Sequence, residues 1–351
     1  MNIAVIGPCG AVGRQIVEQI VVERLLQCDQ RLSLVANPEG ASGSSVYGLA
    51  SDLHDAYNEI CPQIEIVTDP AKLRSDLIVV AAGATARSTL DQTPMTRDGL
   101  AAVNEPVFRH YADSLAATGT GHEIVLCVSN PNELAVHVFA RTLGRHRVIG
   151  MGSYLDSLRF RREIARDLGI RRQAVHAFMV GEHGSGMVPL WSGVHVYGIA
   201  PEDLKAAVRR MHPHGVDEYP GAVSRAFTQL STLIRAGRMA EAYETVDALP
   251  PDVRVAVGPF VTHYSGAKTV IATARATMEF IRTITQGADA LVCGQITLDG
   301  TYGIHGTVGV PFVVGNRGVD RVFEIPLDAG ELESLQQSAL AIGEKILRFT
   351  T

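Results

Sequence analysis

An apolar strand that runs directly into a glycine-rich turn opens the chain and constrains its fold most strongly. Residues 2–7 read NIAVIG, the turn GPCGAVG places glycines at Gly7, Gly10 and Gly13, and an amphipathic helix follows to about Gln27. Glycines let a backbone approach a phosphate closely, and a helix N-terminus offers free N–H groups and the positive end of its dipole. The spacing is GxxGxxG rather than GxGxxG. We predict a dinucleotide site here, against the alternative of a simple tight turn.

Strands and helices alternate through residues 1–150, and this alternation is the second feature that limits the fold. The run DLIVVAAG at 76–83 is almost wholly apolar, as expected for a central strand of a parallel sheet. The pattern predicts an α/β fold in which a Rossmann-type doubly wound parallel sheet forms a dinucleotide-binding domain over residues 1–150. The further strands expected in this domain lie at 32–36, 63–68, 123–130 and 147–152, and its helices include 97–118 and 132–143.

Residues 151–351 follow a different order and are expected to form a second, α+β domain. An amphipathic helix is predicted over 153–170, and two strand-like runs, 174–180 and 191–197, flank the turn GEHG. Residues 201–264 are assigned to this domain rather than to a linker, because their apolar residues recur at helical spacing. A long helix at 264–285, three antiparallel strands up to residue 327 and a closing helix at 328–349 complete the prediction.

The composition excludes several classes of protein. With 46% hydrophobic and 19% charged residues the chain can build sizeable cores, and disorder is not expected. A net charge of −6 gives no reason to expect a nucleic-acid partner. Five scattered cysteines lack CxxC spacing, so neither a metal site nor a disulfide framework is expected. The N-terminus shows no signal pattern and no long apolar run occurs, which predicts a cytoplasmic protein without a membrane partner.

The tip of the second predicted strand departs from the usual dinucleotide site. Such sites place an acid there for the adenosine ribose, but this chain reads Ala36-Asn37. An acid would repel the 2′-phosphate of NADP, and its absence removes that repulsion. No arginine follows to bind such a phosphate, although serines stand at 42, 44 and 45. The expected cofactor is therefore NAD or NADP, with the hypothesis that the preference for NAD is relaxed.

His183 lies in the stretch FMVGEHGSGMVPLW, where glycines leave its ring open to a flat molecule. A histidine suits proton transfer because its pKa lies near working pH, and the alternative is a loop histidine that binds nearby backbone. Asp156 and Arg159 share one face of the predicted 153–170 helix. Asp156 is suited to orient an imidazolium and Arg159 to bind a carboxylate; alternatively the two only pair with each other.

A polar loop at 84–97 follows the fourth predicted strand and carries two arginines, Arg87 and Arg97. Ligands bind beyond the carboxyl ends of strands in such sheets. Arg97 is suited to polarise a substrate carbonyl, although both arginines could also be ordinary solvated charges. Asn130, which precedes Pro131 after the fifth strand, is either a ligand-side residue or a turn former. With the glycine-rich turn and His183, these residues fit hydride transfer to or from a nicotinamide.

The chain resembles the lactate/malate dehydrogenase family in several motifs. The resemblance implies that His183 is the catalytic acid/base, with Asp156 as its partner. It also implies that Arg159 binds the substrate carboxylate, that Arg97 polarises the carbonyl and that Asn130 lies by the substrate and the nicotinamide. A catalytic α+β second domain and a homodimer or homotetramer are further implications. The motifs are GPCGAVG (7–13), ASDLHDA (50–56), VVAAGA (79–84), MTRDGLAAVN (95–104), CVSNPNEL (127–134), VIGMGSYLDSLRFR (148–161) and VGEHGSGMVPLWS (180–192).

This resemblance predicts a set of residues that contact the cofactor. They come from the glycine-rich turn, the tip of the second strand and the motifs that follow the fourth and fifth strands. The candidates are Gly7, Gly10, Ala11, Val12, Gly13, Asn37, Asn104, Val128 and Asn130.

The substrate-side positions depart from the family pattern. The loop between Gly83 and Met95 is longer than is typical, and Arg87 is its best candidate for binding a second carboxylate. The helix expected at the substrate pocket reads SGAK and places Lys268 where the family usually has a small or hydroxyl side chain. On this helix Lys268 faces either solvent or an additional anionic group of the substrate. Malate/oxaloacetate is the first substrate expected. The alternatives are a lactate-like or unusual anionic 2-oxo acid and, in another class, a non-catalytic nucleotide-binding or assembly protein.

Overall fold

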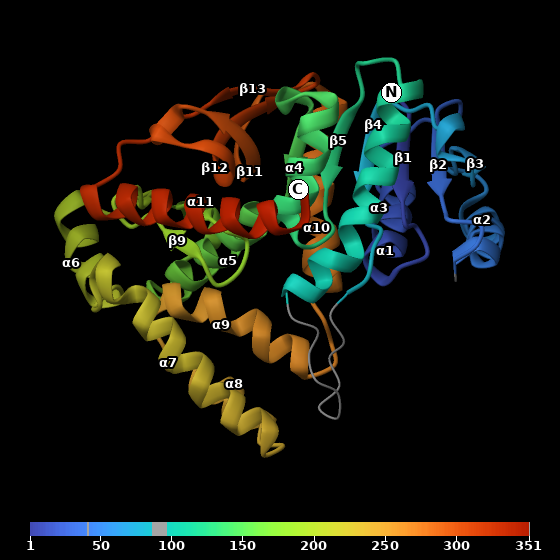
Figure 1. Cartoon of the computed structure of the whole chain (residues 1–351). Helices are drawn as coiled ribbons and strands as arrows, with labels where there is room; N and C mark the ends of the chain where they lie inside the picture. Colours follow the sequence, from blue (N-terminus) through green and yellow to red (C-terminus); the bar gives the residue numbers. More distant parts are fainter. Residues whose placement is uncertain (41, 86–96, 351) are drawn as a thin grey trace.

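The computed structural model describes residues 1–40, 42–85 and 97–350, and it shows a broad sheet flanked by helices (Figure 1). Arg87, and most of the 84–97 loop with it, lies outside the described residues. Within the described ranges, none of the helices combines the length and the apolar character needed to cross a bilayer.

Six parallel strands form the first part of the sheet, in the order β3-β2-β1-β4-β5-β6. The register sets Ile3 of β1 opposite Leu32 of β2 and Leu77 of β4. β1 and β4 are buried along their whole length, which explains their uninterrupted apolar sequence. The predicted doubly wound sheet is confirmed. Its strands are β1 (Ile3–Ile6), β2 (Arg31–Val35), β3 (Gln63–Val67), β4 (Leu77–Val80), β5 (Ile124–Cys127) and β6 (Val148–Gly150).

The helices of the first half connect these strands and cover the sheet. They are α1 (Ala11–Val22), α2 (Ser42–Tyr57), α3 (Arg97–Thr118) and α4 (Asn132–Leu143). Helices α3 and α4 pack against each other, whereas α1 packs against α10 (Val270–Gln286) from the second half of the chain. The second half therefore helps to cover the parallel sheet.

The strands of the second half do not form a separate sheet. β11 (Ala290–Asp299) pairs antiparallel with β6, where Gln295 lies opposite Gly150, so that one 11-stranded sheet runs through the molecule. The predicted antiparallel strands are present, but they extend the parallel sheet at its β6 edge. The remaining members are β12 (His305–Gly315), β13 (Gly318–Val322), β8 (Met179–Gly181) and β9 (Met187–Pro189), and β7 (Val175–His176) pairs separately with β10 (His195–Val196).

A second apolar core lies under helices of the second half. Trp191 packs edge-on against Phe160 and joins a cluster that includes Leu230 and Val257. The helical prediction for 201–264 is confirmed, and Figure 1 shows α7 and α8 projecting from the body of the molecule. The helices are α5 (Gly152–Asp167), α6 (Pro201–Met211), α7 (Gly215–Arg235), α8 (Met239–Asp247), α9 (Pro251–Tyr264) and α11 (Ala329–Thr350).

The helix predicted at 264–285 begins later than expected. Helix α10 starts at Val270, and the SGAK segment forms a turn between α9 and α10. Gly266 and Lys268 both have positive φ, +82° and +52°, and such values interrupt a right-handed helix. The expectation that Lys268 projects from a helix was therefore wrong.

Candidate active site

The glycine-rich turn lies between β1 and α1 at the carboxyl edge of the parallel strands. Gly7 has φ +83°, and its backbone contacts Ala82 so closely that a Cβ would lie 2.7 Å from the Ala82 Cα. Gly13 lies against the Gly7 carbonyl, and a Cβ there would lie 3.0 Å from the Gly7 carbonyl carbon. Gly10 is the residue before α1, so the free N–H groups at Ala11 and Val12 face the turn. The turn therefore has the backbone shape and the donors that a pyrophosphate requires.

A cavity of about 600 Å³ extends from this turn across the tips of β1, β2 and β4. A glycine cradle that opens into a cavity of this size fits an extended dinucleotide. Asn37 lines it at the tip of β2, and its side-chain oxygen accepts a hydrogen bond from the backbone N–H of Glu39 at 3.0 Å. Glu39 also lines the cavity, whereas none of the described lining residues is a lysine or an arginine. The sequence reasoning considered only Ala36 and Asn37 at the strand tip, and it missed Glu39 because this residue lies further beyond the strand.

Asn104 is fully buried and connects the chain after β4 to the chain after β5. Its side-chain oxygen accepts from Ala84 N–H at 2.6 Å, and its amide donates to the carbonyl oxygens of Ala84 at 3.0 Å and of Asn130 at 2.6 Å. Val128 is buried and donates its backbone N–H to Val80. In this structure Asn104 therefore holds Asn130 and Ala84 in place at the edge of the cavity.

His183, Asp156 and Arg159 form a continuous chain of contacts. His183 Nδ1 lies 2.7 Å from Asp156 Oδ2, and Arg159 Nη1 donates to Asp156 Oδ1 at 3.0 Å. Asp156 and Arg159 are one helical turn apart on α5, whereas His183 follows β8. The side chain of Asp156 is 1% exposed, so its charge is balanced by these two partners rather than by water.

The electrostatic environment favours the charged forms of both His183 and Asp156. Burial opposes protonation of His183, but the charge and hydrogen bond of Asp156, with the charge of Glu133, outweigh it and raise the pKa of the imidazole. Burial also opposes ionisation of Asp156, but His183 and Arg159 outweigh that effect and lower the pKa of the carboxyl. An imidazolium on His183 is therefore stabilised where a proton must be held.

The position of the His183 ring is determined by residues from three other elements. Glu133, at the start of α4, accepts the His183 backbone N–H at 2.5 Å and the side-chain amide of Gln295 at 3.2 Å. Gln295 also accepts from Ser153 N–H at 3.1 Å. Gly152 lies against the ring itself. Glu133, Gln295 and Gly152 were not identified from the sequence, because no local pattern marks them.

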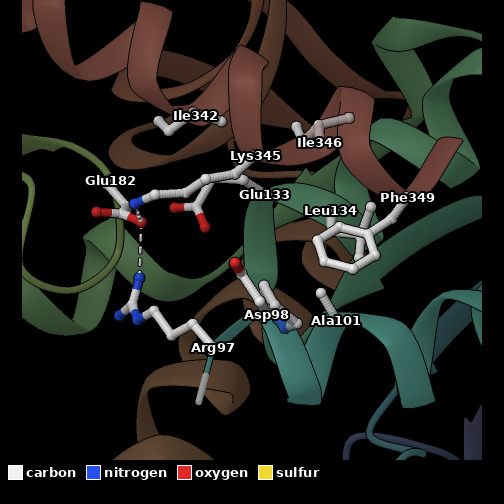
Figure 2. Close-up of a pocket in the computed structure, with 11 residues that line it drawn as sticks. Arg97, Asp98, Ala101, Glu133, Leu134, Glu182, Ile342, Lys345, Ile346 and Phe349 are labelled. Carbon is white, nitrogen blue, oxygen red and sulfur yellow. Dashed lines mark hydrogen bonds and ion pairs between the residues drawn. The ribbon is translucent and has the colours of Figure 1, made fainter. Parts of the chain in front are cut away.

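Arg97 is the first residue of α3 and reaches the loop that carries His183. Its Nη2 donates to the His183 carbonyl oxygen and its Nη1 to Glu182 Oε1, both at 2.8 Å. Figure 2 shows Glu182 between Arg97 and Lys345. Burial raises the pKa of the Glu182 carboxyl, but Arg97 and Lys345 outweigh it and hold that pKa below its ordinary value. The structure thus places Arg97 beside His183, although the sequence reasoning missed Glu182 and Lys345.

Arg159 and Lys268 line a second cavity, of about 570 Å³, between α5, α8 and α9. Lys268 forms no hydrogen bond or ion pair with another described residue. The cavity is rich in cationic groups: its lining includes Arg159, Arg162, Arg166, Arg254 and Lys268, with the carboxylates of Glu163 and Asp247 among them.

Of the predicted site residues, only Arg87 cannot be placed, because it lies outside the described residues.

Two family models match almost the whole chain. The model described as lactate/malate dehydrogenase, NAD binding domain, matches residues 1–150, and the one described as lactate/malate dehydrogenase, alpha/beta C-terminal domain, matches 153–226 and 214–348. These two matches meet at the junction between β6 and α5, directly before Asp156 and Arg159 on α5.

The chain is also similar to curated malate and L-lactate dehydrogenases and to a solved malate dehydrogenase structure. Malate dehydrogenase of Chlorobium phaeobacteroides (strain BS1) is 27% identical over 77% of this chain and 74% of the relative. L-lactate dehydrogenase of Gloeobacter violaceus is 29% identical over 75% of this chain and 70% of the relative. The crystal structure of Cryptosporidium parvum malate dehydrogenase superposes with a TM-score of 0.74 at 23% identity, covering 99% of both chains, and so shares the fold.

Proposed function

Because the chain belongs to the lactate/malate dehydrogenase family, we propose that it interconverts malate and oxaloacetate with NAD as the cofactor. It is a nicotinamide-dependent 2-hydroxy-acid dehydrogenase. The observation that carries the proposal is the contact chain from His183 through Asp156 to Arg159, which combines a proton donor, its charge partner and a carboxylate-binding group. A protein that only bound nucleotides would need none of these groups at such close distances.

The side chains divide the reaction between them. When bound, the cofactor supplies or accepts the hydride. Asp156 binds Nδ1 of His183, which leaves Nε2 to give a proton to the carbonyl oxygen or to take one from the hydroxyl. Arg159 offers its remaining guanidinium N–H groups to the substrate carboxylate in a planar arrangement that a lysine lacks.

Arg97 completes the site as the group that stabilises negative charge on the substrate oxygen. Its guanidinium donates to the backbone carbonyl oxygen of His183, and this proximity supports a role at the same substrate oxygen that His183 would protonate. Arg97 Nη1 donates to Glu182, so a substrate oxygen would compete with that carboxylate for the guanidinium.

NAD rather than NADP is proposed because of the groups at the tip of β2. Glu39 can accept hydrogen bonds from the ribose hydroxyls, and its carboxylate would repel a 2′-phosphate. Among the described residues that line this cavity, no cation is present to offset that repulsion. Asn37 and the serines that follow are neutral and do not reverse the preference.

A second anionic group on the substrate is proposed from the cavity that Arg159 shares with Lys268. Arg159 takes the carboxylate next to the reacting carbon, and Lys268, which has no described partner, takes the more distant one. Arg87 is proposed as a further binder of that group from the loop. A lactate-like substrate, with one carboxylate, would leave Lys268 unpaired.

Domain division, assembly and location are proposals of the same kind. We divide the chain into residues 1–150 and 151–351, at the junction of β6 and α5. We infer a homodimer or homotetramer from the family. All five cysteines are free, which fits the reducing conditions of the cytoplasm.

The experiment that tests the function is the loss of reduced-cofactor absorbance with a panel of 2-oxo acids. We expect turnover with oxaloacetate and NADH, and a loss of about 10²- to 10⁴-fold in kcat for His183→Asn. Turnover of pyruvate in preference to oxaloacetate would indicate the lactate-like alternative. A flat trace with every acid and both cofactors would indicate a non-catalytic nucleotide-binding protein.

A further inference from the structure

Two cations from distant parts of the chain share one oxygen of a buried carboxylate beside His183. Arg97 Nη1 lies 2.8 Å from Glu182 Oε1, and Lys345 Nζ lies 2.7 Å from the same atom. Figure 2 shows these side chains reaching Glu182 from different sides, Arg97 from the start of α3 and Lys345 from α11. Glu182 is only 5% exposed, so water does little to stabilise its charge.

Arg97 has to leave this carboxylate to act on a substrate. A guanidinium that neutralises Glu182 polarises a carbonyl oxygen weakly, because its charge is already balanced. If Arg97 were the only cation at Glu182, its departure would leave a buried carboxylate unpaired, which is strongly unfavourable. Lys345 removes that difficulty, since it stays on Glu182 when Arg97 turns away.

We propose that Lys345 is a positioning residue for the reaction, which keeps the charge of Glu182 balanced while Arg97 moves to the substrate carbonyl. This inference rests on the proposed function. The Glu182 carboxylate is also held by the backbone, because its other oxygen, Oε2, accepts the N–H of Gly186 at 3.0 Å. Glu182 and Lys345 are therefore well placed for this role.

Helix α11 is fixed at this point by a second residue. Ser338 accepts the Glu182 backbone N–H at 3.0 Å and donates to the Gly186 carbonyl oxygen at 2.7 Å. Lys345 therefore projects from a helix that is anchored to the same loop as His183. Gly184 leaves space on the other side, because a Cβ there would overlap the Arg97 guanidinium.

The kinetic test compares Lys345→Met with the double variant that also carries Glu182→Gln. Lys345→Met leaves Arg97 as the only cation at Glu182, so we expect kcat for 2-oxo-acid reduction to fall about 10- to 100-fold. The KM for the substrate should change less, because Arg159 is untouched. The isotope effect with deuterated NADH should increase as hydride transfer becomes slower.

Glu182→Gln removes the charge that retains Arg97. In the Lys345→Met background it should restore kcat to within about threefold of Glu182→Gln alone, a non-additive result. A purely structural role of Lys345 would not be rescued in this way. Arg348→Met is the matched control on α11, because it breaks the exposed ion pair with Asp98 but leaves Glu182 intact, and its kcat should match that of the wild type.

A second readout does not depend on activity. Arg97→Met and Lys345→Met should each raise the unfolding equilibrium constant modestly, since one cation remains at Glu182. Together they should raise it about tenfold or more beyond the product of the single effects. Lys205→Met breaks an exposed ion pair on α6 and serves as the control. Its effect on the unfolding equilibrium constant, when combined with Lys345→Met, should equal the product of the single effects.

The outcomes separate this inference from the proposed function. An active wild type in which Lys345→Met has normal kcat, or a defect that Glu182→Gln does not relieve, would overturn the role of Lys345 alone. Additive stability effects would overturn it as well. A wild type without activity toward any 2-oxo acid would instead refute the proposed function.

Discussion

The backbone of Gly152 lies directly against the ring of His183, and a Cβ at position 152 would lie 2.6 Å from the His183 Cβ. Gly152 is the first residue of α5, the helix that also carries Asp156 and Arg159. The junction between β6 and α5 therefore sets both the position of the imidazole and the position of its charge partner. Gly152 therefore links the end of the parallel sheet to the position of the His183 ring.

Gly152→Ala is expected to displace the His183 ring. Because Glu133 and Asp156 hold His183 from two sides, the ring cannot move away without loss of a hydrogen bond. We expect kcat to fall about 10- to 100-fold, since small misplacements of catalytic groups are costly. The measurement is steady-state kinetics with circular dichroism to verify folding. Gly48→Ala, on α2 with no atoms near the added Cβ, is the control and should retain full activity.

The pH dependence of the reaction should reflect the raised pKa of His183. Reduction of a 2-oxo acid needs the imidazolium, so kcat/KM for reduction should be constant at low pH and fall as the pH rises through a pKa above the ordinary value of His. Oxidation needs the neutral ring and should rise through the same pKa. Profiles of kcat/KM in both directions would measure it.

Asp156→Asn should lower the pKa of His183, because burial then opposes the imidazolium with less charge to offset it. The fall in the reductive profile should move to lower pH, and kcat should drop about 10²- to 10⁴-fold. A profile that keeps its pKa in this variant would mean that Asp156 does not stabilise the imidazolium.

Lys268→Ala should affect dicarboxylates selectively. The side chain is exposed, so we expect KM for oxaloacetate to rise only about 3- to 10-fold, with little change for pyruvate. Lys268→Arg keeps the charge and should retain most of the affinity. Equal changes for both substrates would contradict a contact between Lys268 and the second carboxylate.

Glu39→Gln should shift cofactor selectivity toward NADP. Removing the carboxylate weakens ribose binding and relieves repulsion of the 2′-phosphate, so the ratio of kcat/KM for NADH to that for NADPH should fall about 10- to 100-fold. Glu59→Gln changes the net charge equally at an exposed position on the first domain and should leave the ratio unchanged. Unchanged selectivity in Glu39→Gln would place another group at the ribose.

Local sequence patterns were sufficient to predict the parallel sheet and to mark His183, Asp156 and Arg159 as candidate site residues. A buried parallel strand needs an unbroken apolar run, and β1 and β4 display it. The turn after β1 needs glycine at position 7, where φ is positive and the backbone meets Ala82. Asp156 and Arg159 are three residues apart, and helical geometry alone brings them to one face.

Only the tertiary structure decided how distant segments meet at the site. Lys345 and Glu182 are separated by 163 positions, and no periodicity predicts their contact. The pairing of β11 with β6, which merges two expected sheets into one, depends on which edges lie together after packing. The positive φ of Lys268 and the position of Glu39 in the cofactor cavity likewise follow from turns whose course the surrounding structure determines. Sequence specifies what neighbouring residues do on one element, whereas contacts between elements depend on how their surfaces pack.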